Sequence, residues 1–472
     1  MATAIVWFRR DLRLADNPAL RAALEAGYAV VPVYVHAPEE EAPWSPGAAS
    51  HTWLHRSLQS LQQDLEALGS RLVIRRGNSL DELDRLATET EAEALFWNRL
   101  YEPAVIARDT RVKEHFRHRG LLAESHNAAL LIEPWTIATG AGEPYRVFTP
   151  FWRNAVQRID AQLATPAPTR LPAVSQAVSS LSVDDLGLAP TRDWDTTFWE
   201  HWRPGEAGAQ ELLDVFIDGA ARGYKDQRNF PDRTGSSKLS PHLHFGEISP
   251  RQILQRLRAE NWPVKYEIDI NHYISELGWR EFSHHLLFHY PKTSNENLSP
   301  KFASFRWADP DPEKLAAWQR GRTGIPIVDA GMRELWATGW MHNRVRMIVA
   351  SVLCKNLRYH WLHGANWFWD TLVDADLANN TQGWQWTAGT GADAAPYFRI
   401  FNPVTQSERF DGQGTYIRRW VPELARMPVP ALFAPWEHAE LARELAPAYP
   451  TQPFVDLKAS REAALGALSA SR

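Results

Sequence analysis

The segment AIVWFRRDLRLADNP (residues 4–18) opens on five consecutive apolar residues that are followed by charged ones. Three more apolar runs follow, and they are AVVPVYVH (29–36), RLVIRR (71–76) and EALFWN (93–98). Between them, WLHRSLQSLQQDLEALG (53–69) has apolar residues at spacings of three and four, which predicts an amphipathic helix. Short apolar strands that alternate with helices predict a parallel sheet covered on both faces. We therefore expect a Rossmann-like α/β domain at residues 1–135.

The turn after the first apolar run is RRDLRLADNP (9–18). It lacks the G-x-G-x-x-G pattern with which dinucleotide-binding folds approach a pyrophosphate. The absence of this motif argues against the hypothesis that the protein is a hydride-transfer dehydrogenase.

Beyond the first domain, the character of the chain changes twice. Residues 160–193 are rich in Pro, Ala and Ser without sustained periodicity, which is typical of a surface connector, and we place that connector at 136–194. From about residue 195 strand patterns disappear, and helical patterns are separated by Pro or Gly turns. We therefore predict an all-α domain at 195–472.

The composition excludes several classes of protein. The start MATAIVWFRRDLRL is not patterned as a signal peptide, and no run approaches the roughly 18 apolar residues of a membrane helix. The single cysteine, Cys354, excludes a disulfide framework and a four-cysteine iron–sulfur cluster. We expect a cytoplasmic protein that makes no membrane contact.

Tryptophan and charge are distributed unevenly. The chain has 22 Trp against 19 Phe and 12 Tyr, and thirteen of the tryptophans lie between Trp262 and Trp436. An aromatic helical core explains part of this, and a site that stacks planar ligands or moves electrons is the alternative. The net charge is −5, yet residues 222–420 hold 25 Lys and Arg against 20 Asp and Glu. A basic face on an acidic protein can still attract phosphate.

Two motifs combine polar groups in patterns that suit a ligand. GSSKLS (235–240) offers hydroxyls, backbone N–H groups and a lysine, which suit a pyrophosphate, although a polar turn that caps a helix has the same composition. YISELGWREFSHHLL (273–287) places Glu276 and Arg280 on one helical face beside Trp279. Glu276 and Arg280 can form a surface ion pair, or the carboxylate can bond a flat heterocycle stacked on the indole.

Two later segments add a second polar cluster. GWMHNRVRMIVAS (339–351) places Asn343 and Met347 on one face, and LVDADLANNTQGWQW (372–386) carries two acids with an Asn pair. The spacing does not fit a calcium loop, and His242 and His244 have no metal-ligand set around them, so no metal site is expected. The acids are better suited to accept hydrogen bonds from the N–H of a heterocycle and from Arg346.

Six collinear blocks now give a specific resemblance, and they are WFRRDLRLADNPAL, GSSKLSPHLHFGEISPRQ, ELGWREF, GWMHNRVRM, DADLANNTQGWQW and TGADAAPYFRIFNPVTQSERFD. Together they closely resemble the DNA photolyase/cryptochrome family over residues 5 to about 455, most of all the class I photolyases that repair cyclobutane pyrimidine dimers. The resemblance implies an N-terminal antenna domain and a helical domain that binds FAD and DNA.

The resemblance implies a set of FAD-binding residues. Those for the phosphates and the ribityl chain are Tyr224, Ser236, Ser237, Lys238, Leu239 and Ser240. Those near the flavin ring are Arg280, Asn343, Arg346, Asp374, Asp376 and Asn380. Asn380 is implied to face the flavin N5 atom and to act in catalysis; plant cryptochromes typically have Asp there and animal ones Cys. Tyr273 stands where some relatives have Trp.

The resemblance also implies the residues that act on DNA. The lesion pocket consists of Glu276, Trp279, Asn343, Met347 and Trp386, with Glu276 catalytic through hydrogen bonds to the dimer. Relatives that repair the (6-4) photoproduct use histidines where Asn and Met stand here. Phosphate contacts are expected from Arg228, Arg344 and Arg399, and an electron-transfer triad from Trp384, Trp361 and Trp307.

The implied function is light-driven repair of cyclobutane pyrimidine dimers by electron transfer from excited reduced FAD to a flipped-out dimer. The alternative is a cryptochrome-like blue-light sensor without repair activity, and a dark flavin oxidoreductase lacks a nicotinamide-site motif. Folate-binding relatives have an Asn-Glu pair shortly after a Tyr-Glu pair. In this chain the corresponding Tyr101-Glu102 is followed by Pro103, Ala104 and Val105 instead. The antenna chromophore therefore stays open between a folate, a deazaflavin, another flavin and none. The expected partner is DNA with pyrimidine dimers, and the expected state is a monomer.

Overall fold

The computed structural model describes residues 2–159 and 163–471. The described chain divides into two compact units, each treated by itself below. The sheet unit comprises residues 1–145, 149–219 and 237–291, and the helical unit comprises 146–148, 220–236 and 292–472. This division assigns 195–219 and 237–291 to the unit that holds the sheet, although their sequence is helical. The functional domain boundaries at 135 and 194 stay a prediction.

The sheet unit contains five parallel strands in the order β3-β2-β1-β4-β5. Their bounds are Thr3–Phe8 for β1, Ala29–His36 for β2, Val73–Arg76 for β3, Ala92–Asn98 for β4 and Leu122–His126 for β5. The predicted α/β domain with a parallel sheet is therefore confirmed. The fifth strand was missed because its sequence, LAESH, is mostly polar and its edge position leaves it half-exposed.

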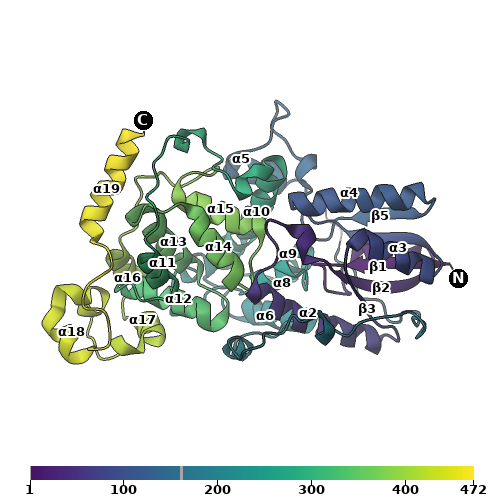
Figure 1. Ribbon diagram of the computed structural model, residues 1–472, viewed down its shortest axis with the longest axis horizontal. Coiled ribbons are helices and arrows are strands. Elements are labelled where there is room, and N and C mark those ends of the chain that lie inside the picture. The colour runs from purple at the N-terminus through teal and green to yellow at the C-terminus, as the bar shows by residue number, and fades with distance from the viewer. Residues whose placement is uncertain (1, 160–162, 472) are drawn as a thin grey trace. The chain divides into compact units, whose positions relative to one another are not determined.

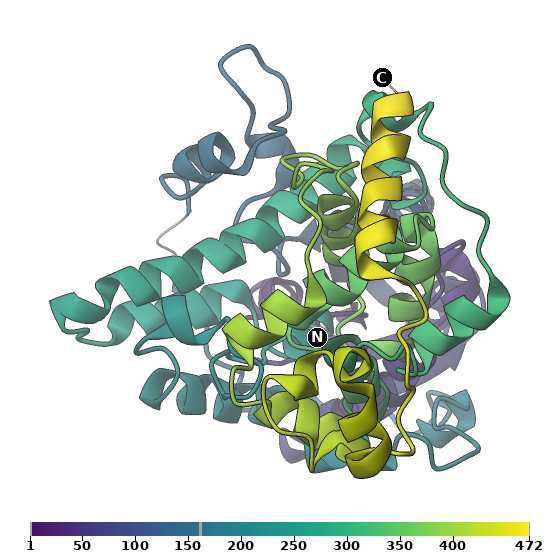
Figure 2. The ribbon, with the colours of Figure 1, turned by 90° about the vertical axis from the view of Figure 1, so that its left-hand side faces the viewer.

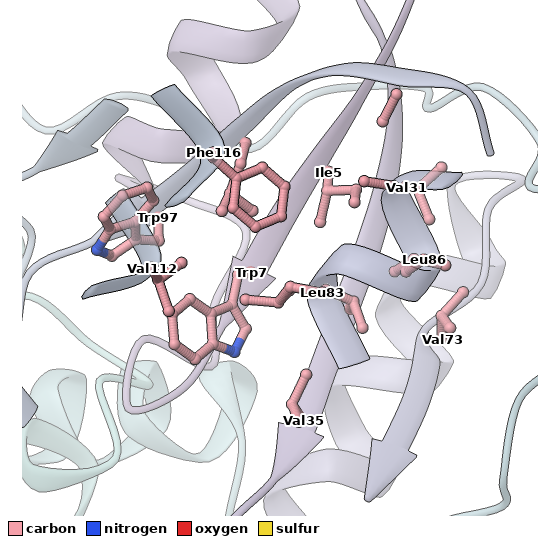
Figure 3. Packing of buried hydrophobic residues seen from close by; sticks show 14 of the residues in the cluster. Ile5, Trp7, Val31, Val35, Val73, Leu83, Leu86, Trp97, Val112 and Phe116 are labelled. Carbon is pink, nitrogen blue, oxygen red and sulfur yellow. The ribbon is translucent and has the colours of Figure 1, made fainter. Parts of the chain in front are cut away.

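Both faces of the central strands are buried, which explains their continuous apolar runs. Ile5 and Trp7 pack with Leu83 and Leu86 of α3 and with Phe116 of α4 on one face, as Figure 3 shows. Figure 1 shows α3 and α4 along the sheet. The helices of this part are α1 (Pro18–Glu25), α2 (Ala48–Ala67), α3 (Ser79–Glu89) and α4 (Pro103–His118).

The Pro- and Ser-rich segment that follows lies along the outer strand β3. Leu181 N donates to Ile74 O at 3.0 Å, and Ile74 N donates to Ser180 Oγ at 2.9 Å. Arg71 donates to Ser175 O at 2.8 Å. Backbone groups at the sheet edge are thereby paired by a segment without strand periodicity. The predicted connector at 136–194 also contains the short helix α5 (Phe148–Ala155), and residues 160–162 lie outside the described part.

The remaining helices carry most of the predicted site. In the sheet unit they are α6 (Glu206–Asp218), α8 (Ser240–His244), α9 (Pro250–Ala259) and α10 (Glu267–His289). In the helical unit they are α7 (Tyr224–Gln227), α11 (Pro312–Gln319), α12 (Pro326–Thr338), α13 (Asn343–Ser351), α14 (Trp361–Thr371), α15 (Leu377–Ala388), α16 (Pro403–Phe410), α17 (Thr415–Trp420), α18 (Ala439–Leu445) and α19 (Leu457–Ala470). Figure 2 shows α19 in yellow at the end of the chain.

The helical unit buries a lysine between α13 and α14. Lys355 lies in the π-helical turn Val352–Asn356 and is fully buried. Its Nζ donates to Tyr397 O at 2.9 Å and lies 3.9 Å from the centre of the Tyr397 ring. Burial lowers the pKa of Lys355 from 10.5 to about 7, because desolvation disfavours the ammonium.

We expect Lys355→Met to remove a pH dependence of stability. The folded-state pKa of Lys355 lies below the unfolded-state value, so the folded protein binds fewer protons between about pH 7 and 10.5. Folding should therefore become more favourable as the pH rises through this window. Between pH 7 and 10 the unfolding free energy of the unchanged protein should rise by about 3 to 4 kcal/mol relative to the variant. Urea unfolding at pH 7 and pH 10 measures this change in the unfolding free energy. Lys458→Met, at an exposed lysine, serves as the control. Equal changes in Lys355→Met and in the unchanged protein would contradict the prediction.

No helix in residues 2–159 and 163–471 combines the length and apolar character needed to cross a membrane. Within the same ranges, no group of three His, Cys, Asp or Glu side chains has a metal-binding arrangement. His242 is instead a core residue, and its Nδ1 bonds the buried Glu247. Glu247 also accepts a hydrogen bond from Trp53 Nε1 at 3.0 Å.

Candidate active site

The loop before α8 is shaped by an unusual backbone conformation and a tyrosine. Lys238 has φ 53°, in the left-handed region that L residues seldom adopt. Ser237 Oγ accepts hydrogen bonds from Tyr273 OH at 3.0 Å and from Leu239 N at 3.4 Å. Burial raises the pKa of Tyr273 to about 12, so the phenol stays protonated and can donate. Tyr273 thus fixes the loop, a contact that sequence analysis did not predict.

The predicted phosphate-binding residues fall in both units. Ser237, Lys238, Leu239 and Ser240 belong to the sheet unit, and Tyr224 and Ser236 belong to the helical unit. Tyr224 is buried, and the Arg228 guanidinium lies 5.4 Å from the centre of its ring.

Helix α10 carries Glu276, Trp279 and Arg280 within two turns. The Glu276 carboxylate is partly exposed and lies 3.8 Å from His272 Nε2. Trp279 packs its ring against Phe282, with 6.0 Å between centroids. Arg280 donates to Ala129 O at 2.7 Å, which ties its guanidinium to the loop after β5.

The same loop is tied to α10 by a buried carboxylate. Glu281 Oε2 accepts hydrogen bonds from Leu131 N at 2.8 Å and from Ile132 N at 3.0 Å. Burial raises the pKa of Glu281, and the adjacent Arg280 partly offsets this. Glu281 therefore holds the C-terminal part of α10 in place, next to the residues predicted to bind the lesion.

In the helical unit, α13 and α15 pack together and place the predicted flavin-edge residues. Arg346 donates to both oxygens of Asp374, at 3.1 and 2.8 Å, and its Nε donates to Met341 O at 2.7 Å. The predicted pairing of Arg346 with Asp374 is therefore found. Asp376 caps α15 and accepts from Asn379 N at 2.8 Å. Asn380 donates to Ala365 O at 3.0 Å, which fixes the orientation of its amide.

The predicted lesion residues of this unit lie on the same two helices. Asn343 is the exposed first residue of α13, and Met347 follows one turn later. Trp386 on α15 is half-buried, whereas Trp384 on the same helix is buried. Their separation by two residues turns the two indoles to different sides of α15.

The three predicted electron-transfer tryptophans are all in the helical unit. Trp384 packs edge-on against Phe368 at 4.9 Å and lies against Gly364 of α14, where a Cβ atom would be 2.0 Å from its ring. Trp361 is the fully buried first residue of α14. The His360 ring lies between Trp361, at 5.4 Å, and the half-buried Trp307, at 5.2 Å.

Four arginines of the helical unit interact electrostatically. The pKa of Arg344 is lowered by burial and then by Arg228, Arg409 and Arg399, in that order. Arg344 and Arg409 both lie over the Phe410 ring, at 4.4 and 5.1 Å. Arg228, Arg344 and Arg399 were predicted together, and Arg409 was missed although it lies in the quoted block TGADAAPYFRIFNPVTQSERFD.

The residues fit a flavin dinucleotide. Hydroxyls and a lysine in a strained loop suit phosphates, and the Arg346–Asp374 pair presents donors and acceptors to a heterocycle edge. Gln382 Nε2 on α15 is buried without a hydrogen-bond partner among the described residues. A Cβ added at Gly383, the exposed next residue of α15, would meet nothing within 4 Å.

Comparisons with known proteins agree with this geometry. Residues 4–172 match the family model "DNA photolyase", and residues 273–470 match "FAD binding domain of DNA photolyase". The chain belongs to the DNA photolyase/cryptochrome family. Its relatives include the deoxyribodipyrimidine photo-lyase of Agrobacterium fabrum, which is 46% identical over 99% of this chain and 98% of that protein. Cryptochrome-2 of Arabidopsis thaliana is 39% identical over 99% of this chain and 79% of that protein.

Solved structures are also similar to this chain. A bacterial class III photolyase from Agrobacterium tumefaciens matches with a TM-score of 0.95 and 45% identity, covering 100% of this chain and 98% of that one. A cryptochrome from Synechocystis sp. PCC6803 matches with a TM-score of 0.90 and 30% identity, covering 99% of each chain. The expectation that the chain most resembles class I photolyases is not supported, because the structure matched at 45% identity is a class III enzyme.

Proposed function

We propose that this protein is a deoxyribodipyrimidine photo-lyase that uses light to split cyclobutane pyrimidine dimers in DNA. The observation that carries the proposal is the placement of Arg346, Asn343 and Met347 on α13 and of Asn380 on α15, which packs against α13. Asp374 lies just before α15 and is paired with Arg346. One surface of paired helices thus offers both flavin-edge and lesion-binding groups. Full-length similarity to a photo-lyase supports it.

The chain's own residues have separate tasks in this proposal. FAD, when bound and reduced, supplies the light-driven electron that opens the cyclobutane ring. Arg346 and Asp374 bind the flavin edge, and Asn380 presents its amide to the flavin N5 region. Tyr224, Arg280 and the 236–240 loop complete the cofactor site.

The lesion is held out of the duplex, as is general for photolyases. Trp279 and Trp386 stack against the dimer, and Asn343 and Met347 line the remaining side. Glu276 hydrogen-bonds the carbonyl or imide groups of the dimer and stabilises the charge that develops there. Arg228, Arg344 and Arg399, with Arg409, contact phosphates and position the strand without reading its sequence.

A sequence identity of 45% to a class III photolyase favours that subclass for this chain. We further propose that the protein acts as a monomer in the cytoplasm.

The experiment that tests the function uses purified, chemically reduced protein and ultraviolet-irradiated oligothymidine. Absorbance of thymine near its band maximum is followed under blue light and in the dark. We expect recovery only in the light. With FAD shown to be bound and reduced, no recovery would exclude photo-lyase activity.

The second candidate is a blue-light sensor, which the similarity to two cryptochromes favours. Asn380 argues against it, because plant cryptochromes typically have Asp and animal ones Cys at the position it resembles. A sensor would change its binding to a partner protein in light while leaving irradiated oligothymidine unrepaired.

We expect Trp307→Phe to slow photoreduction of oxidised FAD and to spare repair by pre-reduced enzyme. Phenylalanine keeps the contact with Phe305 and His360 but is far harder to oxidise than tryptophan. Steady illumination with a thiol, followed by flavin absorbance, measures the first effect, and the oligothymidine assay measures the second. Trp336→Phe, at an exposed tryptophan outside the predicted triad, is the matched comparison. Unchanged photoreduction in Trp307→Phe would show that Trp307 is not part of the electron-transfer chain.

A further inference from the structure

The two buried tryptophans of the predicted triad differ in what their indole N–H groups contact. Trp361 Nε1 donates to Asn297 Oδ1 at 2.8 Å. Trp384 Nε1 is buried and has no hydrogen-bond acceptor among the described residues. This hydrogen bond therefore distinguishes the surroundings of the two indole N–H groups.

The position of Asn297 makes this contact specific. Asn297 lies in the 295–299 segment, whose backbone is tied to α15 by Leu298 N donating to Gln385 Oε1 at 3.0 Å. Gln385 also donates to Thr293 O at 2.7 Å and to Glu296 O at 3.0 Å. The segment is therefore anchored on both sides of Asn297, and its amide is held against Trp361.

The hydrogen bond has a different strength in each oxidation state of the indole. Loss of one electron leaves a positive charge on the ring and makes the N–H a stronger donor. Charge-assisted hydrogen bonds are roughly twice as strong as neutral ones, so the bond stabilises the radical cation more than the neutral ring. The gain corresponds to about a five- to tenfold change in the equilibrium for moving the charge onto that ring.

The chemistry of the acceptor matters as much as its presence. An amide oxygen is too weak a base to take the indole proton, so an oxidised Trp361 keeps its N–H and remains oxidising. A carboxylate at the same place could take the proton and leave a neutral radical. An amide stabilises the charge without trapping it.

We propose that Asn297 is a positioning residue that draws the positive charge from Trp384 onto Trp361 and keeps it available to Trp307. The inference rests on the proposed electron-transfer chain. Trp384 gives one electron to light-excited oxidised FAD and is restored by one electron from Trp361. Trp361 is restored by one electron from Trp307. Trp307 loses its N–H proton to water and is reduced, with one proton, by an external thiol.

His360 extends the path toward the half-buried Trp307. Its Nδ1 accepts from Leu362 N at 3.3 Å as the cap of α14, which places its own proton on Nε2 in the neutral ring. Burial lowers the pKa of His360 to about 4, and the nearby His363 lowers it further by a smaller amount. His360 itself therefore carries no positive charge beside Trp361 and Trp307 at neutral pH.

The test uses the FAD-loaded full chain, laser flash excitation and transient absorption of the tryptophan radicals. Asn297→Leu removes the acceptor and should lower the yield of Trp307 radical about five- to tenfold, with faster return of the electron to Trp384. Asn297→Asp keeps the shape and adds a base. It should produce a neutral Trp361 radical whose formation slows in D₂O, an isotope effect absent from the unchanged protein.

Three controls separate the possible failures. Asn295→Leu, two residues away and bonded to Ser294 Oγ at 3.1 Å, should leave the radical yield unchanged. Ultraviolet resonance Raman of the protein in the dark should show the indole N–H band of Trp361 shifted in Asn297→Leu and retained in Asn297→Asp. Trp361→Phe should abolish the Trp307 radical.

The outcomes distinguish the inference from the proposal beneath it. If Trp361→Phe leaves the Trp307 radical unchanged, the electron-transfer chain itself is wrong. If Trp361→Phe abolishes the Trp307 radical, the electron-transfer chain is supported. If Asn297→Leu then shifts the Raman band without changing the yield of the Trp307 radical, the role of Asn297 is overturned. Loss of yield in Asn297→Leu together with a solvent isotope effect in Asn297→Asp supports the inference.

Discussion

Protein that carries Arg346→Leu is expected to bind FAD about 100-fold more weakly than the unchanged protein. Arg346 makes two hydrogen bonds to Asp374, and the side chains of the pair are 24% and 4% exposed. Leucine removes the charged donor proposed for the flavin edge and leaves the Asp374 carboxylate buried without it. Removal of one member of a buried pair costs about 3 kcal/mol or more in folding free energy. The variant should therefore also be less stable.

Two further variants separate loss of cofactor from loss of stability. Arg333 makes a comparable two-oxygen contact with Glu423, at 3.0 and 2.7 Å, outside the predicted cofactor site. Arg333→Leu should lower stability but retain FAD. Combining Arg346→Leu with Asp374→Leu should restore part of the stability without restoring FAD. The FAD-to-protein absorbance ratio and urea unfolding measure the two effects, and full FAD retention in Arg346→Leu would contradict the assignment.

Glu276→Ala is expected to lower the repair yield at least about tenfold while leaving FAD content unchanged. The side chain is 28% exposed, and an exposed pair such as that with His272, at 3.8 Å, contributes little to stability. A large loss of repair would therefore reflect the lost contact with the dimer. Glu276→Gln keeps hydrogen bonding without a carboxyl group and should retain part of the activity.

The matched control is Glu260→Ala in the same unit. Glu260 pairs with Arg256 at 3.7 Å on the exposed face of α9 and has no predicted part in the lesion pocket. It should repair dimers normally. Single-turnover repair of irradiated oligothymidine by pre-reduced protein gives the yield per absorbed photon. Equal yields from Glu276→Ala and Glu260→Ala would remove Glu276 from the catalytic set.

The local sequence pattern predicted two kinds of element: strands that are buried on both faces of the sheet, and helices that bury one apolar stripe. The four apolar runs became β1 to β4 with boundaries shifted by two residues at most, because continuous apolar runs are forced into a covered parallel sheet. The helix predicted at 53–69 is α2, which begins five residues earlier and ends two residues earlier. Strand β5 was missed because an edge strand is held by backbone pairing with β4, which needs no apolar pattern.

The site shows the same division between local and distant information. The collinear motifs indicated Arg346 with Asp374, and the structure joins them across 28 residues. Tyr273 was noted only as a substitution, yet it bonds Ser237 across 36 residues. Arg409 was not predicted, and its charge lies near Arg344 because both pack on Phe410. Neither hydrophobic periodicity nor motif spacing predicts contacts between residues so far apart in the sequence.

The sequence by itself determined the parallel α/β sheet, the helical remainder and the family, since these follow from local burial patterns and from motifs in a fixed order. Only the tertiary structure decided which side chains restrain those motifs. Asn297 reaches Trp361 across 64 residues, and Glu281 reaches Ile132 across 149. A hydrogen bond depends on two groups being held within about 3 Å, and the packing of the whole fold decides that distance.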